Sequence, residues 1–424
     1  MSKLHTASRS PWFFLPTLYF IEGLPYVLIN TVSVILFKRM GIDNVRIAFW
    51  TSWLYLPWVI KMFWGPLVDI YATKRAWILF TQAGLSLCMF AVAFSLKTEV
   101  FFALSLTAFF AGAITSATND IATDGFYMLA LSEKEQAFFV GLRAGFYRLA
   151  MIFGSGLLVY VAGMLESSSK DIAWSWSTVL IVAGLIFASA GIYHKFILPF
   201  PIADKAHSLR TMESEVAFGE VITSYFGQAK IRVMLAFILL YRLGEAMLLK
   251  LVTPFFLDAQ SVGGLGLSTA QVGLVYGTVG VLSLVSGGIL GGWLISHFRF
   301  KRCVWPMVII MHAPDLFFVY MAYAQPGIGL VFPLVALEQF GYGLGFTIFT
   351  VFLMYSAKGR FKTSHYAIST GIMALGMMLP GFASGWIQQA VGYKFFFLIV
   401  CLLTLPGVLT IPFLPMEQID SGGR

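Results

Sequence analysis

Two carboxylates, Asp120 and Asp124, stand in the most polar stretch of an otherwise apolar segment. Asp120, Asp124 and Tyr127 follow the spacing i, i+4, i+7, which predicts that they share one face of a helix. Two carboxylates one turn apart in a low dielectric repel each other, so one of them is expected to keep an exchangeable proton. That chemistry suits a proton-driven process. The alternative is a structural pair neutralised by Arg143, Arg148 or backbone donors.

Further ionisable side chains interrupt other apolar segments. Inside a membrane each would cost on the order of 3 kcal/mol on insertion scales, so keeping several of them indicates a function. Acids and bases nearly balance, which favours pairs across a polar cavity. Arg242 and Glu245 are three residues apart and are expected to pair, while Asp315 is expected to have a structural role beside His312. The set is Glu22, Lys61, Asp120, Asp124, Arg143, Arg148, Arg242, Glu245, Lys250, Asp315 and Glu338.

The composition defines the setting in which these charges must be held. Of 424 residues, 58% are hydrophobic and only 11% are charged, against about 25% charged in soluble domains. The mean hydropathy is +0.82. These values exclude a soluble enzyme, a disordered chain and a nucleic-acid-binding domain, in spite of the net charge of +8. The three cysteines are far apart and show no metal or redox spacing, so no metal site is expected.

Long apolar segments predict an all-α polytopic membrane protein. A spanning helix needs about 20 apolar residues, and twelve such segments can be placed, six before a polar stretch and six after it. The resulting division is 1–197 for a first six-helix bundle, 198–230 for a cytoplasmic linker and 231–424 for a second bundle. The expected spans are 12–37, 46–66, 76–97, 99–130, 136–162, 173–194, 231–257, 268–296, 304–323, 326–354, 363–390 and 393–415.

The distribution of Lys and Arg predicts the orientation. With both termini in the cytoplasm, most basic residues fall in the inner loops, as the positive-inside rule requires. The first outer loop departs from the rule with Lys38, Arg39 and Arg46. These residues are interpreted as flanking side chains that reach the membrane surface, or as an attraction for anionic solutes.

The two halves of the chain repeat one loop pattern. Gly65 is followed by Asp69 and the pair Lys74-Arg75; Gly292 is followed, at the same spacing, by Ser296 and the pair Lys301-Arg302. The pattern resembles the loop signature of the major facilitator superfamily, whose fold is two six-helix bundles related as parallel repeats. Gly65, Asp69, Lys74, Arg75, Gly292, Lys301 and Arg302 are therefore the expected gating-loop residues. Ser296 in place of the acid weakens the second copy.

Several segments together resemble the AmpG-type muropeptide permeases, within the peptide–acetyl-coenzyme A–drug transporter family. The resemblance covers both halves, and departures include Glu22, Asn119, Arg242 and Glu245, which replace the residue types expected at those places. The matching stretches are 20–25, 56–69, 117–126, 241–246 with 254–255, 341–345, and 366–367 with 384–386.

The resemblance implies a proton-driven carrier in the bacterial inner membrane that imports anhydromuropeptides, cell-wall recycling products, from periplasm to cytoplasm. Its solute would be an anionic glycopeptide and its energy source the proton gradient, with no cofactor; we expect a monomer and no enzyme activity. Transport of a siderophore, acetyl-coenzyme A or a drug, in either direction, stays open. The expected proton-coupling residues are Asp120, Asp124, Glu22 and Glu245; the expected substrate-binding residues are Lys61, Asn119, Tyr127, Arg143, Arg148, Arg242, Glu338, Gln339 and Tyr342.

Overall fold

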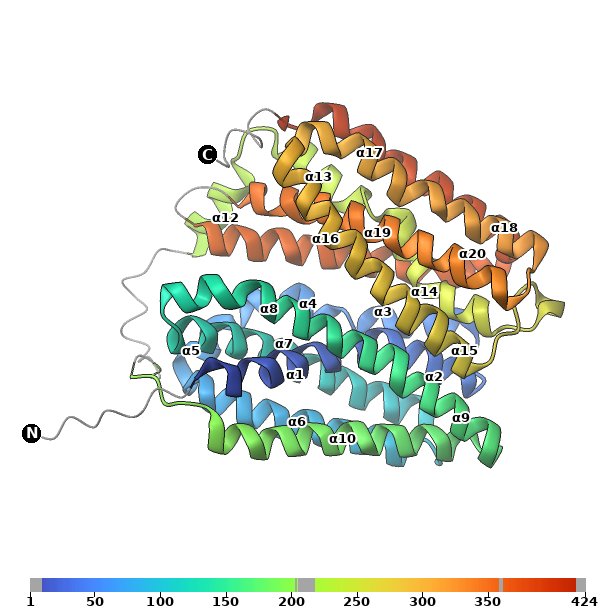
Figure 1. Cartoon of the computed structure of the whole chain (residues 1–424), viewed down its shortest axis with the longest axis horizontal. Helices are drawn as coiled ribbons and strands as arrows, with labels where there is room; N and C mark the ends of the chain where they lie inside the picture. Colours follow the sequence, from blue (N-terminus) through green and yellow to red (C-terminus); the bar gives the residue numbers. More distant parts are fainter. Residues whose placement is uncertain (1–9, 203, 205–217, 358–360, 417–424) are drawn as a thin grey trace, which may run out of the picture. The chain divides into compact units, whose positions relative to one another are not determined.

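The computed structural model describes residues 10–202, 204, 218–357 and 361–416, and within these ranges the regular structure is helical without strands (Figure 1). The α-helices are α1 (Leu15–Val27), α2 (Ser33–Arg39), α3 (Asn44–Trp53), α4 (Leu56–Ile60), α5 (Gly65–Tyr71), α6 (Lys74–Ser95), α7 (Phe101–Ala130), α8 (Glu133–Met151), α9 (Val159–Ser169), α10 (Ile172–Ile197), α12 (Phe218–Phe226), α13 (Ile231–Leu240), α14 (Leu243–Leu257), α15 (Thr269–Val272), α16 (Val281–Phe298), α17 (Phe300–His312), α18 (Leu316–Ala324), α19 (Ile328–Ser356) and α20 (Lys362–Thr410).

Short turns of tighter or wider helix join or extend several of these elements. The 3-10 turns are η1 (Pro11–Phe13), η3 (Lys61–Phe63), η5 (Gln260–Val262), η7 (Ala313–Asp315) and η8 (Ile411–Phe413), and the π-helical turns are η2 (Leu28–Val32), η4 (Ile152–Leu158) and η6 (Gly273–Gly280). Several of the ionisable residues singled out from the sequence, among them Lys61, Arg242 and Asp315, lie on or beside these interruptions and breaks.

Nine stretches of the described chain are long and apolar enough to cross a membrane. The twelve expected spans are present once three interruptions are taken into account. The second span is divided into α3, α4 and α5, and the seventh is divided between α13 and α14. The last two spans form the single helix α20, in which Gly392 has a φ of 72° and separates two helical segments.

The chain folds into two compact units. Unit 1 combines Met1–Val32, Phe63–Gly154 and Leu165–Ser214; unit 2 combines Ser33–Met62, Ser155–Met164 and Glu215–Arg424. Unit 2 therefore contains two segments from the first half of the sequence. Ser33–Met62 packs against α14 and α20, and Ser155–Met164 approaches η6 and α15 through Gly156 and Gly163. Each unit is described by itself below.

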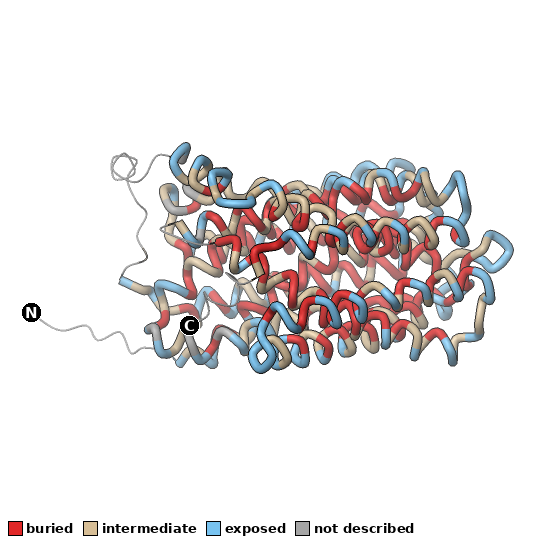
Figure 2. Tube along the Cα trace, turned by 90° about the horizontal axis from the view of Figure 1, so that it is seen from above, coloured by how far each residue is buried: buried red, intermediate tan, exposed pale blue. Residues whose placement is uncertain are grey.

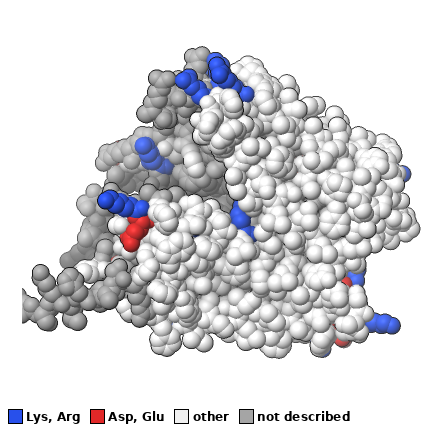
Figure 3. Space-filling view, in the orientation of Figure 1, with Lys and Arg blue, Asp and Glu red and all other residues white. Residues whose placement is uncertain are grey.

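Apolar side chains cover the outside of individual helices as well as their packed faces. On α6, Phe80, Leu87 and Phe94 are each about 70% exposed at seven-residue spacing, while Leu85 and Met89 are fully buried. The alternation of buried and exposed turns is visible along most helices in Figure 2, and the face drawn in Figure 3 carries few charges. A long helix with a continuous apolar outer face is suited to contact with lipid.

Local capping fixes several helix starts. Thr73 accepts a hydrogen bond from the amide of Ala76 at the start of α6. Ser132 and Glu135 form a capping box at the start of α8, where bonds from Ser132 lower the pKa of the exposed Glu135 carboxyl. These starts satisfy amides that a helix leaves without partners.

Glycines allow α16 and α19 to pack backbone against backbone in unit 2. A methyl group at Gly287 would collide with the carbonyl oxygen of Phe340, and one at Gly343 with the carbonyl oxygen of Leu284. The neighbouring Gly288 has room, because its nearest atom would be Thr347 Oγ1 at 3.7 Å. At Gly141 and Gly145 on α8, whose spacing would also permit close packing, a methyl group would meet no described atom within 4 Å.

We predict opposite effects for two adjacent substitutions on α16. Gly287→Ala should destabilise the protein by about 1–3 kcal/mol, because backbone atoms cannot move aside as a side chain can. Gly288→Ala is the matched control and should be neutral or stabilising, since alanine favours a helix over glycine by about 1 kcal/mol. Thermal unfolding of the detergent-purified variants measures the difference. Equal stabilities would contradict the packing of α16 on α19.

Candidate functional site

Asp124 of α7 forms the centre of a polar cluster in unit 1. Its Oδ1 atom lies 3.0 Å from Nη1 of Arg143, on α8, and the two side chains are 50% and 34% exposed. The Tyr19 hydroxyl, from α1, donates to Asp124 at 3.4 Å and accepts from Arg143 at 3.2 Å. The guanidinium also lies over the rings of Tyr19 and Tyr127, 5.5 and 5.2 Å from their centroids. The carboxylate is thus ion-paired, yet reachable by solvent.

The other expected residues of this half surround that ion pair. Asp120 lies half-buried one turn before Asp124 on α7, and Glu22 is buried on α1. Both interact electrostatically with Tyr147 of α8, and Glu22 also interacts with Arg143. Asp120, Asp124, Glu22 and Arg143 therefore belong to one polar region formed by α1, α7 and α8.

Two residues of unit 1 that were expected to bind substrate instead form hydrogen bonds within the protein. The Tyr127 hydroxyl donates to the backbone oxygen of Gln136 at 2.5 Å. Asn119 is fully buried and its Oδ1 accepts from Thr81 Oγ1 at 2.9 Å. A third expected ligand, Arg148, contacts the sulfur of Met151 through its guanidinium. Of these three, the half-buried Arg148 has the most accessible polar group.

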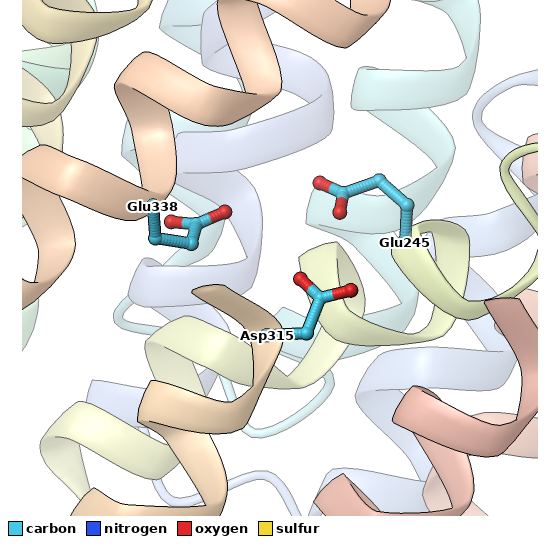
Figure 4. A group of neighbouring side chains, drawn as sticks. All are labelled: Glu245, Asp315 and Glu338. Atoms are coloured by element: carbon cyan, nitrogen blue, oxygen red, sulfur yellow. The ribbon is translucent and has the colours of Figure 1, made fainter. Parts of the chain in front are cut away.

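Unit 2 holds a second cluster, in which Glu245, Asp315 and Glu338 meet (Figure 4). They come from α14, η7 and α19, and one carboxylate oxygen of each lies within 4.8 Å of the others. Each residue is only 1% exposed. Asp315, assigned a structural role from the sequence, is a full member of the cluster. His312 does lie beside it, with Nδ1 3.6 Å from Asp315 Oδ2.

Arg242 does not neutralise this cluster through an ion pair. Its guanidinium donates to the hydroxyl of Tyr342 and lies 5.0 Å from the ring centroid of Phe346. In the part of the chain that the structure describes, no hydrogen bond or ion pair joins Arg242 to Glu245. The direct contact expected from their spacing is therefore not formed, and Arg242 acts on Glu245 only at longer range. A helix break lies at Arg242, the residue before α14, so the two side chains do not follow the spacing of one continuous helix. Gln339 donates to Glu338 Oε2 at 3.0 Å.

Lys250 is a buried cation that the sequence did not assign to a site. It lies on α14, is 3% exposed and donates to Thr51 Oγ1 at 3.0 Å. Its ammonium group also lies 4.8 Å from the ring centroid of Tyr55. Among the described residues it has no carboxylate within ion-pair distance, and a buried charge without a counter-ion is costly. The signal in the sequence that could have identified Lys250 as a site residue was its position inside an apolar span.

Lys61, expected to bind substrate, lies half-buried at the start of η3.

The repeated loops are built differently in the two units. In unit 1, both carboxylate oxygens of Asp204 accept from the amides of Lys74 and Arg75, at 2.7 and 3.0 Å, and Arg75 donates to the backbone oxygen of Lys195. Gly65 starts α5; the side chain of Asp69 lies outside the described residues. In unit 2, Gly292 lies inside the continuous helix α16, and Lys301 and Arg302 are exposed.

A further polar network in unit 2 joins segments far apart in the sequence. Lys38 Nζ lies 2.6 Å from Asp258 Oδ1, and Tyr393 donates to Asp258 Oδ2 at 2.6 Å. Asn44 donates to Asp258, Gln388 and Tyr393. We call Lys38, Asn44, Asp258, Gln388 and Tyr393 the Asp258 network. Lys38 thus has an internal counter-ion, whereas the sequence suggested a side chain that reaches the membrane surface.

The comparisons with known proteins agree with this architecture. The family model described as Major Facilitator Superfamily matches residues 17–379. The chain belongs to this superfamily, and it is a transmembrane transporter with the twelve-helix fold expected from the sequence.

The relatives give a finer resemblance. The anhydromuropeptide permease of Escherichia coli strain K12 is 26% identical over 396 residues, which cover 92% of this chain and 77% of the permease. A solved bacterial homologue of the human lysosomal transporter Spinster has a TM-score of 0.72 at 13% identity, with 99% of both chains covered. A D-xylose–proton symporter has a TM-score of 0.69 at 14% identity, covering 96% of this chain and 98% of its own. The AmpG-type resemblance is confirmed; the solved structures show the fold.

We predict that Lys38 and Asp258 are energetically coupled. A double-mutant cycle with Lys38→Met and Asp258→Asn should give an interaction energy of about 1–3 kcal/mol, because both side chains are more than four-fifths buried and share one network. Unfolding in mixed micelles measures it.

The exposed pair Arg46–Asp43 is the matched control for this cycle. Its atoms are 3.4 Å apart and its side chains are 67% and 53% exposed, so Arg46→Met and Asp43→Asn should couple by less than about 0.5 kcal/mol. A Lys38–Asp258 coupling no larger than this control would contradict the network.

Proposed function

We propose that this transporter imports anhydromuropeptides from periplasm to cytoplasm together with protons, by alternating access. The observation that carries the proposal is the half-exposed ion pair between Asp124 and Arg143. A proton on Asp124 removes its charge, which releases Arg143 to bind a carboxylate of the solute. Proton binding and anion binding then favour each other, as cotransport requires.

Unit 2 offers complementary contacts for such a solute. Arg242 and Lys250 supply buried positive charge, and Tyr342 and Phe346 supply aromatic faces beside Arg242. A muropeptide has several carboxylates and two sugars, so it suits cationic and aromatic walls. Acetyl-coenzyme A is also anionic and is the second candidate that these cations favour. A metal–siderophore complex would favour a more aromatic and less cationic wall.

Two polar networks, the Asp258 network and the contacts of Asp204 with Lys74 and Arg75, suit the two closures that alternating access requires. With both termini in the cytoplasm, Lys38 and Asn44 lie at the periplasmic ends of their spans, so the Asp258 network is our candidate for the periplasmic closure. The contacts of Lys74 and Arg75 with Asp204 lie at the cytoplasmic end. Opening one side while the other stays closed moves the solute without a continuous pore.

Uptake into proteoliposomes with an imposed inward proton gradient tests the substrate. Labelled anhydromuropeptide should accumulate above its equilibrium level, and collapse of the gradient by a protonophore should abolish this accumulation. Labelled acetyl-coenzyme A and a ferric siderophore are compared in the same vesicles. Movement of another solute without muropeptide uptake would overturn the substrate assignment.

Neutral variants of the two acids test the coupling. Asp124→Asn should abolish gradient-driven accumulation and retain counterflow exchange, because binding and conformational exchange need no bound proton while energy coupling does. Asp120→Asn is measured in parallel to find which acid carries the proton. Glu99→Gln, at an exposed acid between α6 and α7, is the matched control and should behave as the unaltered protein. If Asp124→Asn and Asp120→Asn both accumulate substrate normally, the proton site is not in this pair of acids.

A further inference from the structure

Glu245, Asp315 and Glu338 are an unusual concentration of acid in the interior of unit 2. Each residue is 1% exposed, and one oxygen from each lies within 4.8 Å of the other two. Figure 4 shows the three side chains directed toward a common point from three different elements. Three ionised carboxylates this close in a low dielectric repel one another strongly, so the folded chain needs a positive partner for them.

The surrounding side chains do not supply enough positive charge. Arg242 attracts Glu245 from beyond ion-pair distance, but its guanidinium is bonded to Tyr342. Lys250 is bonded to Thr51. Gln339 gives one neutral hydrogen bond to Glu338. Three further titratable groups that interact with the cluster are neutral, namely Tyr276 from η6, Tyr241 and Cys401 from α20. Among described side chains, Glu245 Oε1 and both Asp315 oxygens have no hydrogen-bond donor.

His312 is an independent indication of a ligand. Its side chain is 8% exposed, and its Nδ1 faces Asp315 Oδ2 at 3.6 Å, beyond hydrogen-bond length. Neither ring nitrogen has a hydrogen-bond partner within the described chain. An imidazole that is buried, lacks a hydrogen-bond partner and is directed at a carboxylate leaves a place for a proton or a cation between the two groups.

The spacing of the oxygens fits a small cation. Three atoms no more than 4.8 Å apart can all lie within about 2.8 Å of one central point. This is close to the 2.3–2.6 Å oxygen distances of Ca²⁺, an ion of nearly the same radius as Na⁺. We propose that Glu245, Asp315 and Glu338, with His312 beside them, form a buried binding site for one small monovalent cation, a proton or Na⁺.

This inference deepens the proposed function and rests on it, because a secondary transporter draws its energy from a gradient of such a cation. It moves Glu338 from the expected solute contacts to the cation site and adds Asp315 and His312. Asp315 lies on η7, where α17 gives way to α18, and Glu245 lies in the first turn of α14, after the break at Arg242. Cation occupancy therefore acts on two helix interruptions, where the backbone can respond.

Thermal unfolding of the full chain in detergent with EDTA tests the site without any solute. The melting temperature is measured from pH 5.5 to 8.5, in NaCl or in choline chloride at constant ionic strength. A rise of several degrees specific to NaCl identifies Na⁺; a rise on acidification that is insensitive to NaCl identifies a proton. A melting temperature that responds to neither overturns the proposal.

Variants locate the response. Asp315→Asn and Glu338→Gln should each reduce the shift at least twofold, and the double variant should abolish the shift in NaCl or, for a proton site, most of the acid-induced shift. Glu99→Gln, at the exposed acid between α6 and α7, is the control and should keep the whole shift. If the neutral variants do not fold, Glu338→Asp retains the charge with a shorter reach and should raise the half-saturating cation concentration about tenfold. An unchanged response in the double variant, or in Glu338→Asp, overturns the assignment.

The outcome is distinguishable from that of the transport proposal. A cation response without muropeptide uptake would leave this site standing and remove the assigned solute. Muropeptide uptake by a protein whose stability responds to neither cation would leave the assigned solute standing and remove this cation site.

Discussion

A charge placed in an apolar interior is costly unless other groups of the protein stabilise it, because lipid offers no counter-charge. Three solutions to this constraint coexist here. Asp124 and Arg143 form a pair that solvent can still reach. Lys38 and Asp258 are neutralised within a network of amide and hydroxyl groups. The cluster of Glu245, Asp315 and Glu338 has no complete set of partners among the described side chains.

These solutions differ in how readily they can change during a transport cycle. A solvent-accessible pair can be opened by one proton, whereas a buried network loses several hydrogen bonds together and favours one arrangement. Polar chemistry also coincides with helix interruptions: Arg242 divides α13 from α14, Asp315 ends η7, and Lys61 starts η3. At such places free backbone groups and altered side-chain directions create polar surroundings within a span. The charged residues and the breaks are thus parts of one structural arrangement.

Hydropathy and charge predicted most of the fold, because a membrane-spanning helix is a local property of about 20 residues. The expected spans reproduce the long helices, and α13 and α14 fall within the expected seventh span; the expected second span, 46–66, covers most of α3 and α4 but ends before most of α5. The shared face of Asp120 and Asp124 also followed from helical spacing. Side-chain partners did not follow when a break intervened: Arg242 and Glu245 are three apart, yet the guanidinium bonds to Tyr342.

Contacts across long sequence separations were the other part that the sequence could not provide. Asp315 joins Glu245 and Glu338 only because α14, η7 and α19 converge, and no spacing rule connects these positions. Lys250 likewise meets Thr51 across 199 residues. Such contacts depend on the packing of helices, which a single sequence does not specify by periodicity.

Asp204 also fastens the chain that leaves α10. Its carboxylate binds the first two amides of α6, a position where the helix favours negative charge. Asp204 and Lys74 are 130 residues apart in the sequence. A single carboxylate thus holds together the start of α6 and the chain beyond α10, two parts of unit 1 that covalent neighbours alone would leave independent.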